Sequence, residues 1–152
     1  MSEAERLRRH PFTRGLSDAQ VESLAACARL ARFPEGAAIF REGSEADAAY
    51  LILGGRVSLE QHVPGKGNVQ LENLSGGDLL GLSWLFPGGR WTLDALAVEP
   101  TEAVALEAGR LRARMEEDAA LGFALSRHVI QQLYQRLERV RLQRLDVYRV
   151  GP

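Results

Sequence analysis

Apolar residues change their spacing twice along this chain. Residues 1–31 show helical spacing and predict short helices within 3–30. Residues 32–107 instead hold short apolar stretches separated by turns rich in glycine. From residue 108 to residue 152 the helical spacing returns. The pattern therefore predicts an N-terminal helical segment, a β core and a C-terminal helical segment.

The central segment is typical of a mainly β fold with flanking helices. Its strand-like stretches recur about every 8 to 12 residues, with a hairpin signal at Gly54-Gly55. They lie at residues 38–40, 49–53, 57–61, 69–74, 93–98 and 103–106. This spacing predicts a barrel or jelly roll, that is, a double-stranded β-helix.

A long helix is predicted over about residues 119–148, after a shorter one near Leu111. Its apolar residues recur in steps of four and then three, at Leu121, Leu125, Val129, Leu133, Leu137 and Val140. Such a helix is about 45 Å long at 1.5 Å per residue, which exceeds what a small barrel covers. The helix either pairs with a second copy of the chain through the part of the apolar stripe that extends beyond the barrel, as a dimerisation helix, or folds back over the barrel.

Composition and charge narrow the class of protein. Apolar residues make up 45% of the 152 residues and the net charge is -1, which argues against binding nucleic acid through overall charge. Cys27 is the single cysteine, so an intramolecular disulfide is excluded and a reducing compartment fits. The charged N-terminus has no apolar signal core, and no run approaches the roughly 18 to 20 apolar residues of a membrane span. We expect a cytoplasmic protein.

A cassette at residues 77–92, rich in glycine, carries the candidate chemistry. It begins with Gly77-Asp78-Leu79-Leu80-Gly81 and follows an ordered series of turns and apolar positions at Phe33-Pro34-Glu35-Gly36, Ile39-Phe40, Glu42-Gly43, Tyr50-Leu51-Ile52-Leu53-Gly54-Gly55-Arg56-Val57 and Leu74. With these residues, the chain resembles the cyclic-nucleotide-binding domain family, which includes the catabolite activator protein, FNR-like sensors and the regulatory subunits of protein kinase A. The resemblance implies a jelly-roll sensor core over 32–107.

In that family, a short helix in the cassette offers backbone N–H groups to a cyclic phosphate. A glutamate after the cassette glycine holds the ribose hydroxyl, and an arginine about ten residues later pairs with the phosphate. Here Leu82 replaces the glutamate, and a one-residue gap decides whether the arginine position falls on Arg90 or Trp91. By this resemblance, the expected ligand contacts are Gly81, Leu82, Ser83, Arg90, Trp91 and Thr92.

Several of these residues have a second interpretation. Ser83 bonds a ligand oxygen or caps the short helix. Trp84 and Trp91 stack on a base or line an apolar pocket, or else close the core of the roll. Asp94 points outward from its strand, or faces inward, where it opposes a bound anion or pairs with Arg90.

The histidines argue against an enzyme of the same fold. His10, His62 and His128 fall in three separate predicted segments, whereas metalloenzymes built on this roll bring two or three histidines and a carboxylate to one metal. We expect no catalysis, no metal and no required cofactor. Because the chain ends at Pro152, soon after the long helix, we also expect no helix-turn-helix DNA reader.

Two functions remain open. In the first, the protein is a stand-alone regulatory sensor module for signal transduction. A small anion, with cyclic AMP and cyclic GMP as candidates, binds at the cassette and repositions the long helix, where residues near 127–131 cap the ligand. In the second, the pocket is degenerate, and the protein is a homodimeric scaffold or binds a partner regulator.

Overall fold

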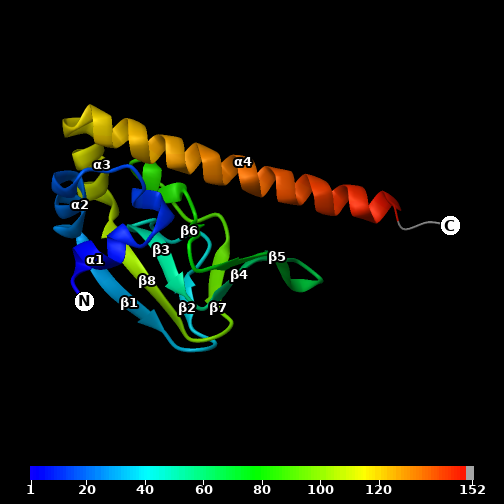
Figure 1. Cartoon of the computed structure of the whole chain (residues 1–152). Helices are drawn as coiled ribbons and strands as arrows, with labels where there is room; N and C mark the ends of the chain where they lie inside the picture. The colour runs from blue at the N-terminus through cyan, green and yellow to red at the C-terminus, as the bar shows by residue number, and fades with distance from the viewer. Residues whose placement is uncertain (150–152) are drawn as a thin grey trace.

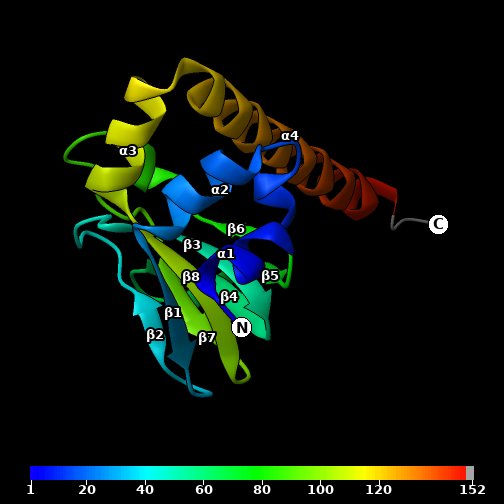
Figure 2. The ribbon, with the colours of Figure 1, turned by 60° about the vertical axis from the view of Figure 1, so that its left-hand side comes forward.

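Two four-stranded antiparallel sheets form a roll (Figures 1 and 2), with the strand orders β1-β8-β3-β6 and β2-β7-β4-β5. The computed structural model describes the backbone of residues 1–149 and the side chains of residues 1–145, so residues 150–152 of the predicted C-terminal segment lie outside it. The elements in chain order are α1 (Glu3–Arg8), η1 (Pro11–Thr13), α2 (Asp18–Ala25), β1 (Ala28–Phe33), β2 (Ala38–Phe40), β3 (Ala48–Gly54), β4 (Arg56–Val63), β5 (Gly67–Ser75), β6 (Leu79–Leu80), η2 (Ser83–Leu85), β7 (Asp94–Ala97), β8 (Thr101–Glu107), α3 (Ala108–Glu117) and α4 (Ala119–Arg149). The predicted jelly roll with flanking helices is confirmed.

The N-terminal helices begin as predicted but end earlier. Ser17 and Gln20 form the capping box of α2, in which Gln20 N–H donates to Ser17 Oγ over 3.2 Å. The prediction of helix through residue 30 is wrong, because residues 28–33 form β1 and pair along their whole length with β8. This pairing with a distant strand outweighs the local helix propensity of alanine, leucine and arginine.

Strand β8 explains why one predicted stretch is apolar without alternation. It lies between β1 and β3 in its sheet, and α1 packs against β1 and β8. Residues 103–106 are all buried as a result. The chain thus uses a continuous apolar run for a strand that is covered on both faces.

Helix α4 has two parts with different surroundings. Leu121, Leu125 and Val129 are buried against the rest of the molecule. Farther along, Leu133 is 45% exposed and Leu137 is 62% exposed, and α4 continues past the roll (Figure 1). The first part therefore folds back over the body of the protein, and the second part leaves its apolar side chains uncovered in the single chain.

Candidate functional site

The cassette begins with a glycine that serves two purposes. Gly81 follows β6 with φ of 77°, a conformation that side chains disfavour. A Cβ atom at this position would lie 2.6 Å from Cζ3 of Trp91. Gly81 thus permits both the turn into η2 and the close approach of Trp91.

Trp91 packs inside the roll. Its ring stacks on Phe40 with centroids 3.8 Å apart and an interplanar angle of 5°, and it is 3% exposed. Trp84 is fully buried, and its Nε1–H donates to the Gly81 carbonyl over 3.0 Å. The structure supports the interpretation that both tryptophans close the core, and Trp91 also lines a cavity.

That cavity lies between the cassette, strands β2 and β4, and α4. Its volume is about 200 Å³, and its lining residues are Phe40, Leu59, Gly81, Leu82, Ser83, Trp91, Thr92, Leu93 and Arg136. Five of the six predicted ligand contacts are brought together here. Their binding role stays a prediction, and the sixth, Arg90, lies elsewhere.

Arg90 points away from the cavity. Its side chain is exposed, it forms an isolated β-bridge with Glu45, and its Nη1 donates to the Gly43 carbonyl over 2.9 Å. Because neighbouring residues in extended backbone face opposite ways, an inward Trp91 requires an outward Arg90. The expectation that Arg90 contacts a ligand beside Gly81 is therefore corrected.

Asp94 contacts the turn after β2 and not Arg90. Its Oδ1 accepts the backbone N–H of Glu42 over 2.8 Å, and its Oδ2 lies 3.4 Å from Nη1 of Arg41. The alternative in which Asp94 pairs with Arg90 is wrong. Asp94 instead fixes the turn that follows β2.

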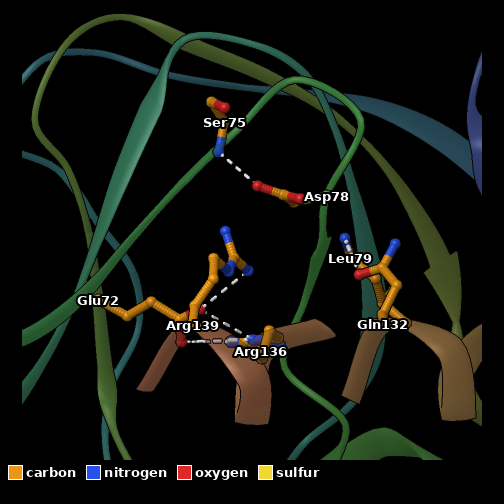
Figure 3. Close-up of polar contacts among 7 residues, drawn as sticks. All are labelled: Glu72, Ser75, Asp78, Leu79, Gln132, Arg136 and Arg139. Atoms are coloured by element: carbon orange, nitrogen blue, oxygen red, sulfur yellow. Dashed lines mark hydrogen bonds and ion pairs between the residues drawn. The ribbon is translucent and has the colours of Figure 1, made fainter. Parts of the chain in front are cut away.

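The cation at the cavity comes from α4. Arg136 lines the cavity and donates three hydrogen bonds to the Glu72 carboxylate of β5, at 3.2, 3.3 and 3.2 Å (Figure 3). Arg139 Nη2 also donates to Glu72 over 3.2 Å. Arg136 is 15% exposed and Glu72 22%, so this pair is better shielded from water than an ordinary surface pair.

Two more polar contacts hold the same face of α4. Gln132 Oε1 accepts the backbone N–H of Leu79 over 2.9 Å, as Figure 3 shows, and His128 Nε2 lies 2.8 Å from the Arg14 carbonyl. Residues 128, 132 and 136 are four apart and so share one helix face. This spacing of polar residues by four is the sequence signal that identifies the face of α4 toward the roll. The sequence analysis followed the apolar stripe of the helix and did not single out this polar series.

The predicted ligand cap on α4 lies away from this site. Arg127 and Gln131 line a separate hollow with Phe123, Ala124, His128, Arg14 and Gly15. Neither residue lines the cassette cavity. Because a residue five to nine positions earlier on a helix lies about 7 to 14 Å back along its axis, Arg136 replaces 127–131 as the part of α4 at the cavity.

The first turn of the cassette is tied to the N-terminal segment. Asp78 Oδ2 accepts the Ser75 N–H over 2.9 Å (Figure 3), and the Asp78 carbonyl lies 3.3 Å from His10 Nε2. His10 Nδ1 accepts the Phe12 N–H over 3.1 Å, so the uncharged ring fits both contacts. Burial lowers the pKa of His10 below its ordinary value of 6.5.

A larger hollow, of about 560 Å³, lies at another part of the roll. It is bounded by the start of β1, residues 45–48, Gly88 and Gly89 of the cassette, the end of β8 and the start of α3, and it carries arginines and carboxylates together. We place the candidate site at the smaller cavity because the cassette, the stacked aromatic pair and α4 meet there.

Two further features of the described residues concern metal binding and membrane insertion. Within residues 1–145, no group of three or more histidine, cysteine, aspartate or glutamate side chains is arranged to hold a metal ion. Within the described helices, none is long and apolar enough to cross a membrane.

Comparison with known proteins identifies the class. The sequence model of the cyclic nucleotide-binding domain matches residues 30–118, more than half of the chain. The chain therefore belongs to the cyclic nucleotide-binding domain family.

Individual relatives agree with this class. The chain is 32% identical over 96 residues to the cyclic AMP receptor protein of Thermus thermophilus, covering 63% of this chain and 44% of the relative. It is 26% identical over 108 residues to the CRP-like cAMP-activated global transcriptional regulator of Mycobacterium tuberculosis, covering 71% and 48%. The matches thus span about half the length of these curated relatives.

A solved structure matches over a larger share of both chains. A Geobacter metallireducens GS-15 protein named for cyclic nucleotide binding superposes with a TM-score of 0.79 at 32% identity, covering 90% of this chain and 99% of that one. The Thermus thermophilus catabolite activator protein superposes with a TM-score of 0.70 at 26% identity, covering 88% and 62%. These likenesses support a regulatory domain of the Crp/Fnr-like type.

Proposed function

We propose that this protein is a regulatory sensor module that binds a small anionic ligand in the cassette cavity and signals through α4. Cyclic AMP and cyclic GMP are candidate ligands, since the relatives with shared sequence are named for cyclic AMP. The observation that carries the proposal is the position of Arg136. One side chain both lines the cavity and anchors α4 to Glu72.

The signalling step follows from this shared side chain. A ligand anion at Arg136 competes with Glu72 for the same N–H donors. A ligand changes a conformational equilibrium only through a difference in affinity between two states. Here, the state in which Arg136 leaves Glu72 offers the ligand a free guanidinium, so binding favours release of the second part of α4.

A second candidate function is a dimeric scaffold or a module that binds a partner regulator. Trp91 packs against Gly81 and Phe40, and the cavity of about 200 Å³ is below the roughly 300 to 1,000 Å³ of ordinary ligand pockets. In this alternative the cavity stays empty, and the exposed apolar side chains of α4 bind a second copy or another protein. We also propose a cytoplasmic location and a regulatory rather than enzymatic role, in keeping with the named relatives.

Titration calorimetry with cyclic AMP, cyclic GMP and a panel of small organic anions tests the first function. We expect saturable binding to at least one of them, weakened roughly tenfold or more in Arg136→Ala, because a hydrogen bond to a charged group is lost. The matched control is Arg90→Ala, which removes an arginine outside the cavity and should leave the affinity unchanged. Absence of binding across the panel, or loss of binding in Arg90→Ala alone, would contradict the proposal.

A further inference from the structure

The cavity wall is suited to a flat apolar group. The stacked rings of Phe40 and Trp91 contribute aromatic atoms to the lining, and Leu59, Leu82 and Leu93 contribute aliphatic ones. Gly81, Ser83, Thr92 and Arg136 form the rest of the lining. An aromatic ring gains contact energy with such a surface when it packs offset or edge-on. The wall thus favours a planar, unsaturated ligand.

The same wall offers a sugar few polar partners. Leu59, Leu82 and Leu93 have no side-chain atom that accepts a hydrogen bond, so among the lining side chains only Ser83 and Thr92 have hydroxyl groups that can accept one from a sugar. A hydroxyl group that leaves water without a partner costs free energy. The volume of about 200 Å³ also favours a ligand more compact than those of ordinary pockets.

The charge at the cavity selects a carboxylate. Among the lining residues, Arg136 is the one that carries a charge, and it already binds a carboxylate, that of Glu72, with both Nε and Nη2. The planar guanidinium matches the two oxygens of a carboxylate in this side-on arrangement. A ligand carboxylate replaces Glu72 with the same geometry and the same charge.

We propose that the ligand is a compact planar aromatic monocarboxylate. Its ring lies against Phe40 and Trp91, and its carboxylate takes the place of Glu72 on Arg136. This inference rests on the proposed sensor function and names the chemical class of its ligand. It also assigns Glu72 as an internal competitor, which keeps α4 anchored until the ligand arrives.

Calorimetry with three matched probes tests the ligand class. Benzoate carries both features, benzamide keeps the ring without the charge, and cyclohexanecarboxylate keeps the charge without the flat ring. We expect benzoate to bind, and each of the other two to bind roughly tenfold more weakly or worse, since each loses one of the two contacts. Equal affinity for all three probes would overturn the assignment.

Two glutamate variants test the competition. Glu72→Gln removes the charge that occupies Arg136, so benzoate should bind several-fold more tightly. Glu138→Gln is the control, because Glu138 pairs with Arg141 on the exposed side of α4 over 2.8 Å and does not line the cavity. Hydrogen–deuterium exchange should show benzoate loosening residues 130–145 in the wild-type chain, and little further change in Glu72→Gln, where that part is already released.

Arg136→Lys locates the bound probe. Lysine keeps the charge but not the planar donor pair, so a folded Arg136→Lys chain should bind benzoate more weakly. Unchanged benzoate affinity in this variant would place the probe outside the cavity and overturn the inference. Binding of a cyclic nucleotide through Arg136, with no binding of benzoate to wild-type or Glu72→Gln chains, would overturn the inference while the sensor function stands. If none of the tested anions binds, both the ligand assignment and the proposed sensor function fail.

Discussion

At the scale of single residues, the opposite directions of the side chains at positions 90 and 91 decide that a tryptophan, and not an arginine, lines the cavity there. Trp91 enters the roll and stacks on Phe40, whereas Arg90 bonds the Gly43 carbonyl outside it. The resemblance to the family predicted the place of the cavity and left these two residues as alternatives. The order Arg-Trp alone does not decide between them, because the packing of Phe40 and Gly81 does.

His10 gives a prediction at this scale. Its folded-state pKa lies below the unfolded value of 6.5, so the unfolded chain binds the extra proton first as the pH falls. We therefore expect the free energy of unfolding to decrease as the pH falls below about 6.5, until the lowered folded-state pKa is reached. Urea denaturation from pH 7.5 to 5 measures it.

A pair of variants assigns that pH dependence. His10→Asn keeps an acceptor for the Phe12 N–H in place of Nδ1, but does not titrate. It should flatten the slope, whereas His62→Asn, at an exposed position on β4, should leave the slope as it is. The same slope in His10→Asn as in the wild-type chain would contradict this assignment.

At the scale of elements, α4 changes its means of attachment along its length. Its first turns are held by buried leucine and valine side chains, and the turns near the cavity by Gln132 and Arg136. Buried apolar contacts persist as long as the chain stays folded, whereas the Arg136 guanidinium can exchange one carboxylate partner for another. In the proposed sensor function, the second part of α4 is therefore the part that ligand binding releases.

Because of this gradient, leucine-to-alanine substitutions in the two parts of α4 should lower the free energy of unfolding by different amounts. Leu125→Ala removes a fully buried side chain and should lower the free energy of unfolding by about 2 to 5 kcal/mol. Leu133→Ala, at a position 45% exposed, should change it by about 0.5 kcal/mol or less. Urea denaturation at a protein concentration that keeps the chain monomeric measures both. Equal losses would contradict a helix anchored mainly through its first part.

At the scale of the whole molecule, the exposed apolar side chains of α4 favour a dimer. From residue 130 to residue 145 they are Ile130, Leu133, Tyr134, Leu137, Val140, Leu142 and Leu145, between 45% and 65% exposed in the single chain. Exposed apolar area of this kind is typical of protein interfaces. A second copy that pairs along α4 would bury the same residues on both chains.

Light scattering tests the dimer. We expect a dimer in the absence of any ligand, which Leu133→Asp converts to a monomer by placing a charge in the apolar interface. Leu71→Asp is the control, because Leu71 is 46% exposed on β5, close to the 45% of Leu133. A wild-type monomer at micromolar concentration, or equal dissociation by both variants, would count against pairing through α4.

The sequence by itself determined the jelly roll, the position of the cassette and the extent of α4, because local turn glycines and apolar spacing specify these features. The lining of the candidate cavity was only partly predictable. Gly81 and Trp91 reach the cavity, but Arg136 lies 55 positions after Gly81 and arrives there only through the path of α4 over the roll. The tertiary structure also decided that residues 28–33 form a strand, since β8 supplies its hydrogen-bond partners. Distant parts of the chain make these contacts, so no local pattern encodes them.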